Sequence, residues 1–261
     1  MTDSSSNFPG EPHNELPADR RTQLRGVEAI RRALEGGHPL RLVIADRSAT
    51  SSAVSVLVAR CEAAGVRTRR ASPQEMRRLS PSGRPSEIVA LAGPDPNLEL
   101  REIFSLPGVV WLLAGGRYPG NAGYVIRSAE ISGAAGVVID ARFDRAGRRD
   151  CGRASMRADR YFPVHFAASR EALELARAAG RRIIAIEDVG TSSPWQTDLR
   201  GDLLIMIGGE REGIAPALLE EADEIVAIPS GGFLPSYNLQ AAMGIVMGER
   251  LRQCSEPVSR Q

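Results

Sequence analysis

The sequence predicts an α/β fold, in which a small N-terminal α/β domain precedes a larger, mostly parallel, doubly wound sheet. Short apolar runs, of the length of buried strands, alternate along the chain with stretches of helical periodicity. Glycine or proline stands at most of the junctions, where the chain has to turn. Repeated strand-helix units of this kind are typical of parallel sheets that carry helices on both faces.

The first domain is predicted over residues 20–93. Residues 1–19 before it are rich in serine, proline and acidic residues and poor in apolar ones, which predicts a disordered tail. Glycines at Gly36-Gly37 and at Gly65 end the first two helical stretches of the domain. Its helices are expected at 27–34, 53–64 and 73–79, and its strands at 40–45, 66–70 and 87–92.

The periodicity breaks at residues 93–97, which read Gly-Pro-Asp-Pro-Asn. Proline fixes its own backbone and disfavours helix in the residue before it, so residues 94–105 are predicted as a linker and 106–254 as a second domain. Its strands are expected at 109–114, 136–139, 183–187, 203–207 and 225–228, and its helices at 122–132, 170–179, 216–221 and 238–252. The arginine-rich stretch 142–160 is expected to form a loop.

The length and the composition of the chain limit the classes of protein to which it can belong. The chain has 261 residues, of which 43% are hydrophobic and 25% charged, enough for two modest domains. Its apolar stretches are far shorter than the roughly 18 to 20 residues that span a bilayer, and residues 1–7 lack a secretory apolar core. We therefore expect a soluble cytoplasmic protein without a membrane partner.

Cys61, Cys151 and Cys254 are isolated from one another and from the histidines, so neither disulfides nor a metal site is expected.

The basic residues exclude several kinds of chemistry. All 33 are arginines, because the sequence contains no lysine. P-loop phosphate transfer, protein-kinase chemistry and Schiff-base mechanisms each need a lysine ammonium, so none of them applies. The net charge is only +1, yet arginines crowd residues 67–84 and 142–160. Such runs fit either a solvated surface or a polyanionic partner.

Three segments at predicted strand-to-helix junctions carry residues suited to a ligand site. The sequence has no G-x-G-x-x-G dinucleotide fingerprint, no G-x-S-x-G elbow and no H-E-x-x-H helix. In the first segment, residues 119–129, Asn121 is suited to cap a helix, and Arg127 follows about one and a half turns later. The second segment is Gly208-Gly209-Glu210 and the third is Ser236-Tyr237-Asn238. Taken singly, each also fits a helix cap or a plain turn.

Together, the three segments resemble the three motifs of the SpoU-type branch of the SPOUT RNA methyltransferases. The matching residues are, in order, Asn121-x-Gly123 with Arg127 and Ala129, Gly208-x-Glu210 with Gly213, and Ile228-Pro229 with Ser236-x-Asn238. The resemblance covers residues 109–252. Residues 25–30, Arg-Gly-Val-Glu-Ala-Ile, also resemble the opening of the ribosomal-protein-like module that often precedes this catalytic domain. The resemblance therefore implies that residues 20–93 bind the RNA substrate.

The resemblance implies an enzyme that transfers a methyl group from S-adenosylmethionine to a ribose 2′-hydroxyl, works as a homodimer and contains a deep trefoil knot. It implies catalytic roles for Arg127, which would act on the hydroxyl, and for Asn121, Glu210, Ser236 and Asn238. It implies cofactor contacts from Ile186, Ile207, Gly208, Gly209, Ile228 and Leu239.

The N-terminal module favours rRNA over tRNA as the partner, and 23S rRNA in particular. This class includes enzymes whose methylation protects ribosomes from antibiotics. A tRNA 2′-O-methyltransferase and a non-catalytic RNA-binding or ribosome-assembly factor are the alternatives.

A few positions depart from the residues that are usual in the family. Tyr237 stands where a small aliphatic residue is common, and Leu239-Gln240 replaces valine-serine. Tyr118 stands where an acidic residue commonly precedes the proline of the first motif. The bulk of the two tyrosines is expected to narrow the cofactor pocket.

Overall fold

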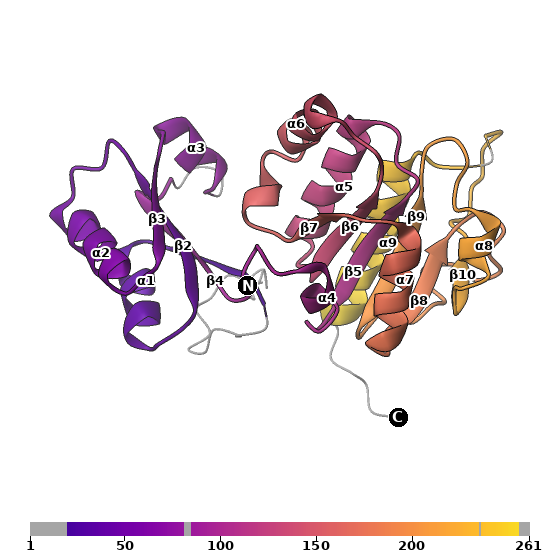
Figure 1. The fold of residues 1–261 in the computed structure, drawn as a ribbon, viewed down its shortest axis with the longest axis horizontal. Helices are drawn as coiled ribbons and strands as arrows, with labels where there is room; N and C mark the ends of the chain where they lie inside the picture. Colours follow the sequence, from indigo (N-terminus) through magenta and orange to yellow (C-terminus); the bar gives the residue numbers. More distant parts are fainter. Residues whose placement is uncertain (1–19, 81–84, 235, 256–261) are drawn as a thin grey trace, which may run out of the picture. The chain divides into compact units, whose positions relative to one another are not determined.

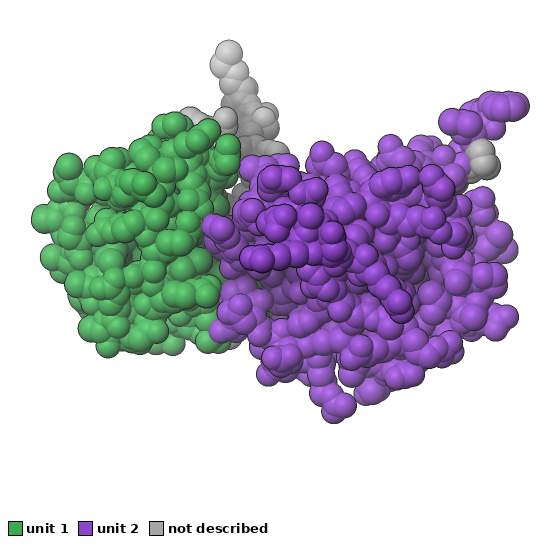
Figure 2. Space-filling view, turned by 45° about the horizontal axis from the view of Figure 1, so that its top comes forward, with its two compact units in different colours: residues 1–94 green, residues 95–261 purple. Residues whose placement is uncertain are grey.

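The computed structural model describes residues 20–80, 85–234 and 236–255. The chain divides into two compact units, residues 1–94 and 95–261, each of which is described by itself (Figure 2). The predicted tail, residues 1–19, lies outside the described residues. The division falls inside the Gly-Pro-Asp-Pro-Asn stretch that interrupts the periodicity of the sequence.

The N-terminal unit contains, within its described residues, a four-stranded sheet with the strand order β1-β4-β2-β3 (Figure 1). Strand β4 lies antiparallel to β1 and β2, whereas β2 and β3 are parallel. The strands are β1 (Thr22–Arg25), β2 (Leu40–Asp46), β3 (Arg67–Ala71) and β4 (Ile88–Ala92), and the helices α1 (Val27–Glu35), α2 (Ser52–Ala63) and α3 (Pro73–Arg78). The sequence did not predict β1, because Leu24 is its only buried residue and no apolar run marks it.

The C-terminal unit contains, over the part of it that the structure describes, a six-stranded parallel sheet with the order β10-β8-β9-β5-β6-β7. The strands are β5 (Val109–Ala114), β6 (Gly136–Asp140), β7 (Val164–Phe166), β8 (Arg182–Ile186), β9 (Leu203–Gly208) and β10 (Glu224–Val226). The helices are α4 (Leu100–Ile103), α5 (Pro119–Ile131), α6 (Arg145–Ala154), α7 (Ser169–Ala178), α8 (Pro216–Leu219) and α9 (Leu239–Ser255). The predicted parallel α/β architecture is confirmed.

Helices cover both faces of this sheet (Figure 1). Along β5, the fully buried Trp111 and Leu113 pack in a core shared with residues of α5 and α9. The intervening Val110 and Leu112 pack in a second core, shared with residues of α4 and α7. Because side chains alternate along a strand, the two cores lie on opposite faces. The predicted doubly wound arrangement is therefore present, and the carboxyl ends of the central strands open at one edge, where such sheets bind ligands.

Further segments differ from the sequence predictions, which also lacked the short strand β7. The range 94–105, predicted as a linker, contains α4, and Ile103 and Phe104 are buried in the core of the C-terminal unit. The range 142–160, predicted as a loop, forms α6, which packs closely on α5. A Cβ on Gly123 of α5 would lie 2.5 Å from the carbonyl oxygen of Cys151 in α6. Apolar residues are few in α6, and its contact with α5 depends on Gly123, so no apolar run in the sequence marked the helix.

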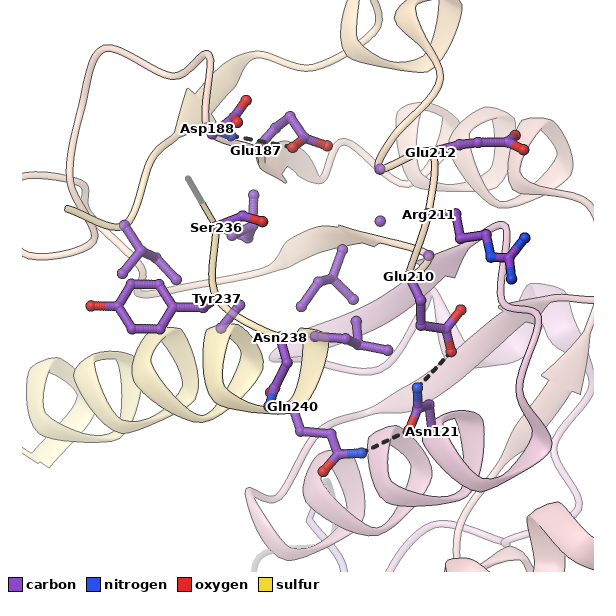
Figure 3. Close-up of a pocket in the computed structure, with 18 residues that line it drawn as sticks. Asn121, Glu187, Asp188, Glu210, Arg211, Glu212, Ser236, Tyr237, Asn238 and Gln240 are labelled. Carbon is purple, nitrogen blue, oxygen red and sulfur yellow. Dashed lines mark hydrogen bonds between the residues drawn. The ribbon is translucent and has the colours of Figure 1, made fainter. Parts of the chain in front are cut away.

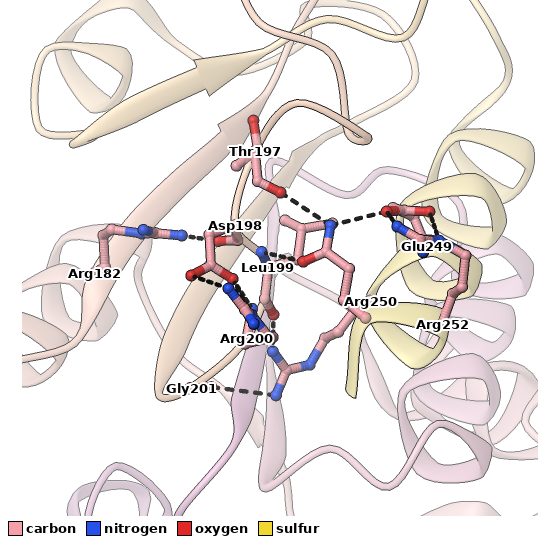
Figure 4. Close-up of polar contacts among 10 residues, drawn as sticks. Arg182, Thr197, Asp198, Leu199, Arg200, Gly201, Glu249, Arg250 and Arg252 are labelled. Atoms are coloured by element: carbon pink, nitrogen blue, oxygen red, sulfur yellow. Dashed lines mark hydrogen bonds and ion pairs between the residues drawn. The ribbon is translucent and has the colours of Figure 1, made fainter. Parts of the chain in front are cut away.

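The C-terminal part of α9 is fastened to the loop between β8 and β9 (Figure 4). The Leu199 amide donates to Gln253 Oε1 at 2.8 Å, and Gln253 Nε2 donates to the Thr197 carbonyl at 3.0 Å. Arg250 donates to the carbonyls of Leu199 and Gly201.

The trefoil knot that the resemblance implies stays a prediction. No helix among the described residues is both long and apolar enough to cross a bilayer.

Candidate functional site

A cavity of about 510 Å³ lies at the carboxyl ends of β8, β9 and β10 (Figure 3). Its walls come from the start of α5, the two loops after β8 and β9, and the segment that leads into α9. The structure brings the predicted site residues together around this cavity, with the exception of Arg127. Those that line it are Asn121, Ile186, Ile207, Gly208, Gly209, Glu210, Ile228, Ser236, Asn238 and Leu239.

Glycines shape the loop after β9, because the backbone around it comes too close for a side chain. A Cβ on Gly209 would lie 2.1 Å from the carbonyl oxygen of Gly115, and one on Gly208 would lie 2.4 Å from the carbonyl carbon of Gly213. Gly209 also donates its amide to the Ala114 carbonyl at 2.8 Å. The loop therefore folds back on the end of the sheet, and at Gly208 and Gly209 it presents backbone to the cavity.

Glu187, directly after β8, braces the same loop. Its Oε2 accepts the Ile214 amide at 2.8 Å, and a Cβ on Gly213 would lie 2.5 Å from that oxygen. Gly213 has a φ of +63°, in the left-handed region that glycine adopts without strain. Glu187 and its neighbour Asp188 line the cavity, and sequence reasoning missed both. The available signal was their place, two acidic residues directly after a buried strand.

Asn121 joins the first segment to the second and third. Its Nδ2 donates to Glu210 Oε1 at 2.7 Å, and its Oδ1 accepts from Gln240 Nε2 at 2.8 Å (Figure 3). Glu210 Oε2 accepts the backbone amide of Arg117 at 3.2 Å. The expectation that Asn121 caps the helix is wrong, because α5 begins two residues earlier, at Pro119, with Tyr118 at the cap position. The side chain of Asn121 is thereby released for contacts across the cavity wall.

The third segment leads into α9. Asn238 Oδ1 accepts the Ala241 amide at 2.8 Å, so Asn238 caps this helix, as its residue type allowed. The Tyr237 hydroxyl donates to the Pro229 carbonyl at 3.2 Å. Although Tyr237 lines the cavity, its ring points away from Asn121 and Glu210 (Figure 3). Its bulk therefore lies at the side of the cavity remote from these two residues.

Arg127 is exposed on α5 and does not line the cavity. Among the described residues, its guanidinium has neither a hydrogen bond nor an ion pair. A single chain therefore does not bring this arginine to the other predicted site residues.

The lining combines apolar and acidic groups. Isoleucines at 186, 207 and 228, with Leu239, provide apolar wall. The charged lining consists of four carboxylates, those of Glu187, Asp188, Glu210 and Glu212, and one guanidinium, that of Arg211. Apolar wall suits a flat heterocycle, and carboxylates favour a cationic ligand over a polyphosphate. S-adenosylmethionine, which has an adenine and a positively charged sulfonium, fits this donor set. Within the part of the chain that the structure describes, no cluster of three or more His, Cys, Asp or Glu residues is arranged to hold a metal ion.

Known proteins are similar to this chain in sequence and in fold. The chain is 29% identical over 199 residues to a 23S rRNA (adenosine(1067)-2′-O)-methyltransferase from Streptomyces laurentii, a match that covers 76% of this chain and 74% of the relative. It is also 29% identical over 163 residues to an uncharacterised tRNA/rRNA methyltransferase from Mycolicibacterium vanbaalenii. That match covers 62% of this chain, and it spans about half, 52%, of the mycobacterial protein.

Among solved structures, the SpoU methyltransferase AviRb from Streptomyces viridochromogenes, in complex with the cofactor AdoMet, is similar to this chain. The TM-score is 0.53 and the identity 25%, with 92% of each chain covered. The family model of the SpoU rRNA Methylase family matches residues 108–248, which contain all three segments and the cavity. The chain is therefore an RNA methyltransferase of the SpoU type and belongs to the SpoU rRNA Methylase family.

Proposed function

We propose that the protein methylates a ribose 2′-hydroxyl of 23S rRNA, with S-adenosylmethionine as the methyl donor. The observation that carries the proposal is the convergence of the three segments on one cavity at the strand ends. The relative from Streptomyces laurentii, whose printed activity is on 23S rRNA, supports the substrate class, because it is matched over both units of this chain. A tRNA substrate is the second candidate, since the mycobacterial relatives are named as tRNA/rRNA methyltransferases.

The residues of the cavity have distinct roles in this proposal. Ile186, Ile207, Ile228 and Leu239 would contact the adenosine, and the backbone of Gly208 and Gly209 would bind its polar edges. When bound, the cofactor supplies a methyl group already activated by its sulfonium. The protein's own task is then to position the ribose hydroxyl and to stabilise the charge that develops on its oxygen.

Arg127 is proposed to perform that task from a neighbouring subunit. A guanidinium holds its protons too firmly to be an efficient base, but it donates hydrogen bonds and carries a permanent charge. Its exposure and its absence from the cavity lining of its own chain support action on the site of a second protomer. Asn121, Glu210, Ser236 and Asn238 would order the cavity wall that faces it.

The surface around Arg127 supports a homodimer. On the same helix, Tyr124 is 46% exposed and Ile131 71% exposed. On α9, Gly244 and Gly248 face open space, and Leu251 is 43% exposed. Glycines four residues apart allow a second helix to approach closely, and exposed apolar side chains beside them mark an interaction surface. We propose that α5 and α9 form the contact between two copies of the chain.

The arginine clusters are proposed to hold the RNA. In the N-terminal unit, Arg67 and Arg70 lie exposed on β3, an edge strand of its sheet. In the C-terminal unit, Arg145 and Arg149 lie exposed on α6. Both sets fit the phosphate backbone, which dominates protein–nucleic acid affinity. Protection of ribosomes against antibiotics and a cytoplasmic location stay predictions.

Isothermal titration calorimetry with S-adenosylmethionine tests the cofactor assignment, with ATP as the comparison ligand. The acidic lining predicts binding of S-adenosylmethionine and no binding of ATP at the same concentration. Tight ATP binding with no heat from S-adenosylmethionine would overturn the proposal.

A further inference from the structure

Gln240 lies at the start of α9 and contacts the cavity wall, although its residue type gave no reason to expect a functional role. Its Nε2 donates to Asn121 Oδ1 at 2.8 Å, and Asn121 Nδ2 donates to Glu210 Oε1 at 2.7 Å. Glu210 Oε2 accepts the Arg117 amide at 3.2 Å. The bonds form a continuous relay from α9, through α5, to the loop after β9 (Figure 3). Gln240, Asn121 and Glu210 all line the cavity.

The relay has a fixed direction, because its members differ in what they can donate. An ionised carboxylate only accepts hydrogen bonds, so Asn121 has to present its amide nitrogen to Glu210. The oxygen of Asn121 then faces Gln240, which has to present its own nitrogen. Any other orientation of Gln240 would place two oxygens in contact. The Glu210 carboxylate therefore fixes the orientation of the Asn121 amide, and the amide nitrogen of Gln240 supplies the donor that this orientation requires.

We propose that Gln240 is a positioning residue, which sets the orientation of the Asn121 amide and, through it, of the Glu210 carboxylate at the wall of the methyl-donor cavity. The inference rests on the proposed function of that cavity. Where the family usually has serine, this chain has a side chain whose nitrogen reaches Asn121. Gln240 thus ties the third motif to the first two, and without this donor the Asn121 oxygen would lose its partner.

A reversal experiment tests the relay. In the Gln240→Glu variant, the new carboxylate can only accept, so Asn121 has to turn and present its oxygen to Glu210. Two acceptors then meet, so the Asn121 and Glu210 side chains have to leave their places in the cavity wall, and the Kd for S-adenosylmethionine is expected to rise about tenfold. In a Glu210→Gln background, the amide nitrogen at position 210 can donate to the Asn121 oxygen, and the Asn121 nitrogen can donate to the new carboxylate of Gln240→Glu. Every donor of the relay then faces an acceptor again. There, Gln240→Glu is expected to change the Kd by less than about threefold.

Two controls separate the relay from plain charge repulsion. Ala241→Glu adds a carboxylate at the next residue of α9, which is exposed and has no side-chain bond to Asn121. It is expected to change the Kd for S-adenosylmethionine by the same small factor in the unsubstituted protein and in the Glu210→Gln variant. In an Asn121→Ala background the relay is absent, so Gln240→Glu should lose its effect, whereas direct repulsion by Glu210 would persist.

The outcomes distinguish this inference from the proposed function. Calorimetry on the full chain would be the readout, with circular dichroism to establish that each variant is folded. If the unsubstituted protein fails to bind S-adenosylmethionine, the proposed function is wrong. If it binds but Gln240→Glu has no effect, or has the same effect in all three backgrounds, the positioning role of Gln240 is wrong.

Discussion

Arg127 stands apart from the other predicted site residues, because it lies on the surface of its own chain while they line the cavity. Replacing it with alanine removes a guanidinium that forms neither a hydrogen bond nor an ion pair with the described residues. The Arg127→Ala variant should therefore keep its stability and its affinity for S-adenosylmethionine. Methyl transfer should fall by at least about a hundredfold, the typical cost of losing a group that stabilises transition-state charge.

The matched control is Arg101→Ala, which removes an exposed arginine of α4 far along the chain from the three motifs. It should transfer methyl groups at the rate of the unsubstituted protein. Single-turnover methylation with a fixed RNA measures both variants. Full activity of Arg127→Ala would contradict the role proposed for this side chain.

Site residues that belong to a sequence motif could be predicted from the sequence. Residues that reach the site only through the folding of the chain could not. Asn121 and Glu210 were found by their spacing from glycines, although the cap assigned to Asn121 was wrong. Glu187 was missed because its partner, the Ile214 amide, lies beyond the next strand. Gln240 looked like a departure from a motif, and its contact with Asn121 spans a separation that no local pattern reveals.

The loop after β9 is the element on which the cavity depends most closely. In Gly209→Ala, the new Cβ would lie 2.1 Å from the Gly115 carbonyl oxygen, so one backbone segment has to move. Overpacking of this kind costs about 1 to 3 kcal/mol. We expect a higher Kd for S-adenosylmethionine and a lower Tm, measured by calorimetry. Gly231→Ala is the control, because a Cβ there meets no atom within 4 Å.

Arg181 holds the elements of the C-terminal unit together. It is 3% exposed, and its guanidinium donates to the carbonyls of Phe104 at 3.0 Å and Leu203 at 3.2 Å, as well as to that of Leu106. Burial lowers the pKa of Arg181. The guanidinium supplies the hydrogen bonds that water would otherwise donate to carbonyls at the end of α4 and beside the start of β5. For this reason the segment predicted as a linker is packed against the unit rather than extended.

Arg181→Met should therefore destabilise the C-terminal unit by about 3 kcal/mol, because several buried carbonyls lose their donor. Chemical denaturation measures the difference. Arg170→Met provides the comparison, since Arg170 forms an exposed ion pair with Glu221 and such pairs contribute little. An equal loss in both variants would show that the buried guanidinium has no special role.

At the scale of the whole molecule, the fold class was predictable because parallel strands in a covered sheet are apolar on both faces and leave clear runs in the sequence. Strand β5, Val109–Ala114, is buried along its whole length and was predicted with its bounds. Helix α6 was not predictable, because arginines dominate it and its contact with α5 depends on Gly123. The proposed association of two chains rests on exposed apolar residues of α5 and α9 and on two glycines of α9.

The proposed dimer can be tested through Ile131, which is 71% exposed on α5 beside Arg127. Ile131→Asp places a charge in the proposed contact and should give a monomer by light scattering, with loss of methyl transfer. Val56→Asp changes another exposed apolar residue, 60% exposed on α2 of the other unit, and should leave the assembly intact. A monomeric but fully active Ile131→Asp variant would refute action across a dimer.

Transfer of radiolabel from S-adenosylmethionine to RNA tests whether the cavity at the strand ends delivers a methyl group to RNA. The protein would be incubated with 23S rRNA and, separately, with tRNA, and the RNA digested to nucleosides. We expect label in a 2′-O-methylated nucleoside of the 23S rRNA, and we expect this label to be absent with Arg127→Ala. Label on a base, or no label in either RNA from a protein that binds the cofactor, would contradict it.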